Sequence, residues 1–153
     1  MNIVKFPKLK HIKGHFYEMH TDLVITDTKD YGTLIVRAKT KTGGFFLTDI
    51  TTCPSFLKPI LSDFTSGNTP YAFATAALVH DAFLHPETQI ISSKLKPSEI
   101  NAVRKSSSET DLSYFRTLRH FGVSLPIATG LFLGVRMWSL SPKFIRNAIH
   151  SKF

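Results

Sequence analysis

The sequence predicts a single α+β domain in which a small N-terminal antiparallel sheet is followed by three to four packed helices. Short β-branched runs separated by turn residues fill the first third of the chain, and stretches with helical periodicity follow from residue 70 onward. The 153 residues are 42% hydrophobic, which is enough for one core and excludes a disordered chain.

Residues 1–20 are basic and irregular, and we interpret them as an N-terminal arm or an edge strand in front of a domain that covers residues 21–153. An anion-binding strip is the alternative. The spacing of the histidines does not favour a metal site. The basic and histidine residues of this arm are Lys5, Lys8, Lys10, His11, Lys13, His15 and His20.

Three short runs predict the strands of the sheet. Residues 23–26 and 33–38 are rich in β-branched side chains, and Asp30-Tyr31-Gly32 supplies turn residues between them, as in a hairpin. Two glycines then precede a third run at residues 45–48. Residues 49–54 end in proline and predict a loop, and residues 55–64 could hold a short helix.

The stretch Pro70–Leu84 predicts a buried helix, because nearly all of it is small or apolar and proline suits a first helical position. His80 and Asp81 are its one adjacent polar pair. At helical spacing His80 falls on the apolar face and Asp81 on its edge. The pair is either a core histidine beside a solvated aspartate or part of a functional site, since unpaired buried charges are costly.

Two further helices are expected after a polar excursion at residues 86–108, which could itself contain a short helix at 97–105. Residues 109–121 have helical periodicity and end before Gly122. Asp111 lies on the buried stripe of this helix. Ser108-x-x-Asp111 is also a variant of the capping box, so capping and functional roles for Asp111 both stay open.

Residues 123–140 form the most apolar part of the chain. Pro126, Gly130, Gly134 and Arg136 interrupt them, which favours a packed core helix over a membrane span. Membrane insertion or surface binding through this segment is the alternative. A last basic amphipathic turn or two follows from Pro142.

The formal net charge of +8 favours an anionic partner, such as a lipid surface or an acidic protein. Nucleic acid is less favoured because the basic residues are scattered and no recognised motif is present. The single cysteine, Cys53, excludes an internal disulfide. The N-terminus lacks the apolar core of a signal peptide.

Three polar features suggest a hydrolytic site: Asp49 in a loop, His80-Asp81 in one helix and Asp111 in another. Two antiparallel helices could bring His80 and Asp111 together as a general base and its orienting carboxylate. Asp81 could hold a hard cation such as calcium with Asp49 and loop carbonyls. A histidine base beside a bound cation is typical of hydrolases.

A set of motifs resembles a family of small uncharacterised phage and prophage proteins whose pattern is F-x-T-D-x-A-S-x-P, H-D-x-L-Y, A-D-x-x-F, G-V and A-V-R. The likeness covers residues 20–138. Thr51-Thr52 replaces the Ala-Ser pair, and the aromatic residue after His-Asp is missing. This resemblance implies a phage-encoded protein of the host cytoplasm or the virion. The matching stretches are Phe46–Pro54, Ala77–Leu84, Thr110–Phe115, Gly122-Val123 and Val135-Arg136.

A more distant likeness is to phospholipase A₂, which has a His-Asp pair on one helix and an aspartate on a later helix. The resemblance makes His80 the base for water, Asp81 a calcium ligand and Asp111 the residue that orients the histidine. The calcium loop would lie near residues 49–54, where the glycine-rich pattern of that family is absent. The remaining pocket or substrate residues of this hypothesis are Thr51, Thr52 and Arg136.

Other classes compete with a phospholipase-like hydrolase. HD phosphohydrolases are all-helical and need further histidine ligands, whereas this chain has hairpins and no histidine between His20 and His80. A Cys53–His80 nucleophile pair lacks any signature. The serious alternative is a non-catalytic phage protein, either a virion component or an inhibitor that binds a host protein.

Overall fold

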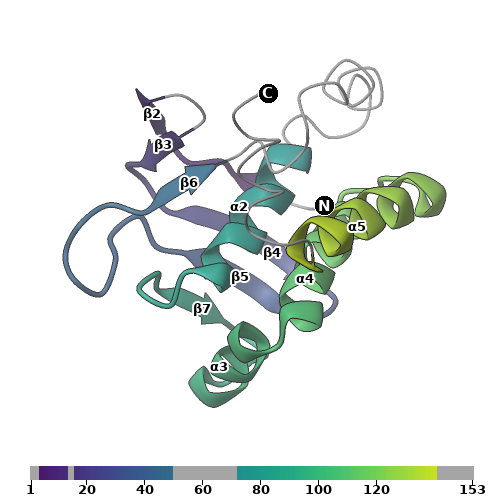
Figure 1. The fold of residues 1–153 in the computed structure, drawn as a ribbon. Coiled ribbons are helices and arrows are strands. Elements are labelled where there is room, and N and C mark those ends of the chain that lie inside the picture. The colour runs from purple at the N-terminus through teal and green to yellow at the C-terminus, as the bar shows by residue number, and fades with distance from the viewer. Residues whose placement is uncertain (1–3, 14–15, 50–71, 141–153) are drawn as a thin grey trace.

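The structure is a computed structural model that describes residues 4–13, 16–49 and 72–140, apart from the side chains of Val4, Asp49 and Trp138. The predicted α+β class is confirmed. Figure 1 shows the strands on one side of a central helix, with further helices on its other side. Within the described residues, two antiparallel sheets supply the strands and four helices complete the fold.

The first sheet has the strand order β1-β4-β5-β7. It comprises β1 (Val4–Lys5), β4 (Leu23–Thr28), β5 (Gly32–Val36) and β7 (Ile90–Ser92). The β4–β5 hairpin is the one that the sequence predicts, and its side chains alternate as a half-buried sheet requires. One face supplies the core residues Leu23, Ile25, Leu34 and Val36, which are at most 1% exposed.

The second sheet has the order β2-β3-β6 and consists of β2 (Leu9–Lys13), β3 (Phe16–Met19) and β6 (Leu47–Asp49). Residues 1–20 were expected to form a basic arm or an edge strand. The edge-strand alternative holds for β1 and β2, which lie at the edges of the two sheets, whereas β3 pairs on both sides. Met19 is fully buried, so this segment belongs to the folded domain.

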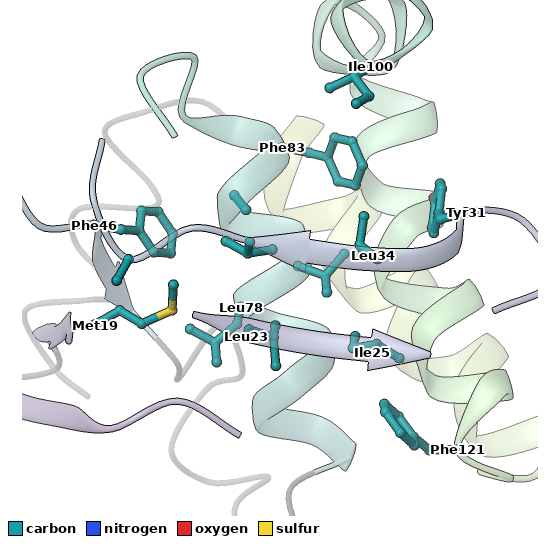
Figure 2. Packing of buried hydrophobic residues seen from close by; sticks show 14 of the residues in the cluster. Met19, Leu23, Ile25, Tyr31, Leu34, Phe46, Leu78, Phe83, Ile100 and Phe121 are labelled. Carbon is teal, nitrogen blue, oxygen red and sulfur yellow. The ribbon is translucent and has the colours of Figure 1, made fainter. Parts of the chain in front are cut away.

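Helix α2 (Ala72–Leu84) is the predicted central helix and is buried on nearly all sides. Ten of its thirteen residues are buried, which explains why its sequence is apolar around the whole circumference. Figure 2 shows Leu78 and Phe83 of α2 among the side chains of the β4–β5 hairpin. Ala76 and Ala77 instead join a second cluster with residues of the later helices.

Three more helices follow: α3 (Pro97–Lys105), α4 (Ser107–His120) and α5 (Leu125–Leu140). The expected short helix at 97–105 is confirmed. Helix α4 begins earlier than expected because its N-cap is Ser106, whose side chain accepts a hydrogen bond from the Glu109 amide. Asp111 therefore does not cap the helix. Its carboxylate points to other partners.

Strand β7 was not expected, because residues 86–108 were interpreted as an exposed excursion. Its three residues pair with β5 and complete the first sheet. None of the helices that the structure describes combines the length and apolar character needed to cross a membrane. The predicted loop beyond Asp49, the short helix at 55–64 and the basic turn after Pro142 lie outside the described residues.

Candidate functional site: a buried histidine between two aspartates

Helix α2 carries two polar side chains into the interior of the protein. His80 is 3% exposed and Asp81 is 5% exposed. An imidazole and a carboxylate in such apolar surroundings need hydrogen-bond partners, because leaving them unpaired costs free energy. The structure supplies these partners from β6, α4 and α5.

His80 and Asp111 are adjacent, as their positions on the apolar faces of two helices predict. His80 Nε2 lies 2.7 Å from Asp111 Oδ1. The two helices approach closely because Ala76 and Ala77 of α2 pack in one cluster with Tyr114 and Leu118 of α4. The predicted contact is therefore confirmed, whereas its catalytic role stays a prediction.

Helix α5 fixes the Asp111 carboxylate from the other side. Arg136 Nη1 donates to Asp111 Oδ2 at 2.9 Å, and Ser139 Oγ donates to Oδ1 at 3.1 Å. The sequence analysis assigned Arg136 to the pocket or substrate. In the structure its guanidinium pairs with Asp111, which is only 1% exposed. Arg136 is thus a partner of the orienting carboxylate.

Asp81 connects the histidine to the second sheet. Its Oδ2 accepts a hydrogen bond of 2.8 Å from Thr48 Oγ1 on β6, and its Oδ1 lies 3.7 Å from His80 Nδ1. We call the connected set the His80 network. It consists of Thr48, His80, Asp81, Asp111, Arg136 and Ser139.

The two aspartates govern the protonation of His80. Burial acts to lower the pKa of the imidazole, but the hydrogen bond to Asp111 and the nearby Asp81 carboxylate outweigh it and raise the pKa from 6.5 to about 8. At neutral pH the imidazolium form is favoured. Above pH 8 the ring becomes a neutral base.

The two ring nitrogens of His80 have different surroundings. Nε2 contacts Asp111, so in the neutral ring its proton is held there and Nδ1 carries the lone pair. Among the described residues, Nδ1 makes no hydrogen bond. Its distance of 3.7 Å from Asp81 Oδ1 is too long for a direct hydrogen bond.

The expected cation site is described only in part. The side chain of Asp49 and the whole of Thr51 and Thr52 lie outside the described residues, so their approach to Asp81 is not tested. No group of three or more His, Cys, Asp or Glu residues that could hold a metal occurs in the described segments. Calcium binding by Asp49 and Asp81 stays a prediction.

The N-terminal histidines and Cys53 were weaker candidates for a metal site and a nucleophile. His20 Nε2 lies 2.7 Å from Glu18 Oε1, and the His11 ring contacts Tyr17, so each has a neighbour in β3. His15 and Cys53 lie outside the described residues. The Cys53–His80 pair is therefore not tested.

The sequence analysis did not select Thr48 or Ser139 as members of the site. For each of them, the spacing to a neighbouring residue in the sequence indicated an inward position. Thr48 follows the buried Phe46 by two residues, which places both on the inner face of a strand. Ser139 lies three residues after Arg136, which places the two on one face of a helix.

No family model, curated protein or solved structure matches the chain. The resemblances to phage proteins and to phospholipase A₂ therefore stay predictions.

Proposed function

We propose that this chain is a phage-encoded hydrolase in which His80 activates water, and that its substrates are esters of the phospholipid type. The geometry of His80 carries the proposal. Its Nε2 is fixed by Asp111 at 2.7 Å, while its Nδ1 makes no hydrogen bond in the described residues and lies 3.7 Å from Asp81 Oδ1. A base with one oriented nitrogen and one available nitrogen is what water activation requires.

The reaction follows from these two nitrogens. Neutral His80 takes a proton from water at Nδ1 as the water oxygen bonds to the ester carbonyl carbon. The imidazolium formed is stabilised by Asp111 and Asp81. It then returns the proton to the departing alkoxide when the ester bond breaks, so that the products are a carboxylic acid and an alcohol. Arg136 and Ser139 keep the Asp111 carboxylate in position throughout.

Calcium is the cofactor that the phospholipase-like hypothesis requires, with Asp49 and Asp81 as its carboxylate ligands. Oxygen ligands of this kind prefer calcium or magnesium to zinc. A bound calcium would polarise the ester carbonyl. In the described residues Asp81 Oδ2 accepts a hydrogen bond from Thr48 Oγ1.

A second candidate function has its own support. The His80 network ties β6, α2, α4 and α5 together, and Asp111 receives three side chains. A network with these connections can serve the fold alone. In that case the chain is a non-catalytic phage protein, such as a virion component or an inhibitor of a host protein.

His80→Asn separates the two functions, with His85→Asn as the matched control because His85 is exposed at the end of the same helix. Both variants and the parent chain would be assayed for fatty-acid release from phosphatidylglycerol vesicles with and without calcium. Hydrolysis per folded molecule should fall at least about 100-fold in His80→Asn and stay unchanged in His85→Asn.

Stability must be measured on the same preparations. His80→Asn should lower the free energy of unfolding by about 1–3 kcal/mol under either function, because buried partners lose a hydrogen bond. Activity per folded molecule is therefore the deciding quantity. If the parent chain releases no fatty acid, or if His80→Asn keeps full activity per folded molecule, the network is structural and the hydrolase proposal fails.

A further inference from the structure

A pocket of about 350 Å³ lies between the β4–β5 turn and helix α4. One wall consists of residues 28–31, and the other comes from the second half of α4 between Phe115 and His120. The Tyr31 side chain, 3% exposed, lies at this end of the hairpin, as Figure 2 shows. A cavity of this size accepts a small organic molecule.

The turn that forms the first wall is internally braced. Thr28 Oγ1 donates to the Gly32 carbonyl at 2.7 Å and accepts from the Tyr31 amide at 3.0 Å. Lys94 Nζ donates to the Lys29 carbonyl at 2.7 Å. Because these contacts fix the backbone on both sides of Lys29, its side chain starts from a defined position at the pocket.

The charges around the pocket are unbalanced. Among the lining residues, Lys29, Arg116 and Arg119 contribute three positive charges and Asp30 one negative charge. Glu109, which pairs with Arg116 beside the pocket, adds a second negative charge and leaves a formal surplus of one. Burial lowers the pKa of His120, so its imidazole adds no charge at neutral pH. This surplus favours an anionic ligand.

The two arginines differ in how much of their binding capacity is already engaged. Arg116 Nη1 pairs with Glu109 at 3.1 Å, and its Nε lies 3.8 Å from Asp30. Arg119 Nη1 donates to the Val123 carbonyl at 2.9 Å, which is its one hydrogen bond to the described residues. A guanidinium has five N–H donors, so Arg119 retains several for a ligand.

Cations in the last turn of a helix also have a simpler role, since they interact favourably with its C-terminal carbonyls. This explains Arg119 by itself. It does not explain Lys29, which reaches the same pocket from another element, nor the aromatic lining by Tyr31 and Phe115. The combination is typical of recognition of a flat apolar group attached to an anion.

We propose that this pocket binds a small organic phosphate that carries an aromatic or similarly flat group. Lys29 and Arg119 contact the phosphate, and Tyr31 and Phe115 contact the ring. Arg116, held by Glu109 and Asp30, adds a fixed positive charge. This site is separate from the His80 network, because none of its lining residues belongs to that network.

Isothermal titration at pH 8 and 0.15 M NaCl tests the proposal with three probes: phenyl phosphate, inorganic phosphate and benzoate. Phenyl phosphate combines a dianion with a ring, whereas the other two each lack one feature. It should bind at least about tenfold more tightly than either, since each missing contact group weakens binding. Tighter binding of benzoate, or no binding of phenyl phosphate, would overturn the assignment.

Charge-matched variants exclude a general electrostatic effect. Lys29→Gln combined with Arg119→Gln should weaken phenyl phosphate binding at least about tenfold. Lys10→Gln combined with Lys105→Gln removes the same charge from exposed positions outside the pocket and should leave binding nearly unchanged. Equal losses in the two double variants would contradict a built site. Lys29→Gln alone provides the comparison should the loss of Arg119 affect folding, and His80→Asn should bind phenyl phosphate normally.

Discussion

Asp111 is the residue on which the His80 network depends, because its two oxygens receive side chains from α2 and α5. Asp111→Asn would present an amide to donors and leave the Arg136 charge uncompensated. The free energy of unfolding should fall by about 3–5 kcal/mol, as when one partner of a buried ion pair is removed. Urea unfolding measures this loss.

The same variant should change the titration of His80. Without the Asp111 carboxylate, the effect of burial should dominate and the pKa of His80 should fall well below about 8. Nuclear magnetic resonance titration of the imidazole reports this shift. Asp30→Asn is the control for the stability measurement. The Asp30 side chain is 40% exposed and lies 3.8 Å from Arg116 Nε, so this change should lower the free energy of unfolding only slightly. An equally large loss of unfolding free energy in Asp30→Asn would contradict a special role for Asp111.

The proposed chemistry predicts how hydrolysis depends on pH. Water activation requires neutral His80, and the pKa of His80 is raised to about 8. The ratio kcat/KM should therefore rise tenfold per pH unit below pH 8 and level off above it. Initial rates between pH 6 and 9 provide the test, with the folded fraction measured at each pH. A rate that falls over this range would rule out His80 as the base.

At the scale of the elements, the end of α4 shows how local sequence determines backbone geometry. The Gly122 amide donates to the Arg119 carbonyl and the Val123 amide to the Leu118 carbonyl, a Schellman motif with Gly122 at φ 81°. Gly122→Ala should lower the free energy of unfolding by about 1–2 kcal/mol, because a side chain disfavours this left-handed conformation.

Gly130→Ala is the matched control in α5, where the glycine has open space around its Cα and helical backbone geometry. Alanine has the higher helix propensity, so this change should stabilise the protein by about 0.5–1 kcal/mol. Thermal unfolding of both variants shows whether each change raises or lowers the stability. The same sign for both changes would mean that backbone conformation does not control the effect.

The elements differ in how well the sequence predicted them. Helix α2 (Ala72–Leu84) was predictable because its length and its apolar residues agree, and the β4–β5 hairpin because turn residues separate two β-branched runs. Strand β7 was not predictable, since its three residues become a strand only by pairing with β5. The division into two sheets likewise depends on long-range pairing.

At the scale of the whole molecule, the contact between His80 and Asp111 was predictable because both residues lie on faces that a core must bury. The partners Thr48 and Ser139 were not selected, because their part in the site depends on how β6 and α5 are rotated against α2 and α4. Arg136 was selected for the site but assigned to the substrate. Its position on an otherwise apolar helix indicated a buried partner, but the sequence does not determine which one.

The His80 network also links protonation to the stability of the whole fold. Because the pKa of His80 is about 8 in the folded protein and 6.5 for an unperturbed histidine, as in the unfolded chain, folding favours the protonated ring. This contribution is fully present below pH 6.5 and is lost as the pH rises through 8. The difference of 1.5 pH units corresponds to about 2 kcal/mol.

Urea unfolding of the parent chain and of His80→Asn at pH 6 and pH 9 measures this contribution directly. The stability difference between the two proteins should shrink by about 2 kcal/mol at the higher pH. His120, whose pKa is lowered, is present in both proteins and cancels in the comparison, and Tyr31, whose pKa is raised above 10, titrates outside this range. A difference that stays constant would show that the aspartates do not hold a proton on His80. The base proposed for hydrolysis would then already be neutral at pH 7, and the rise in rate should move to lower pH with it.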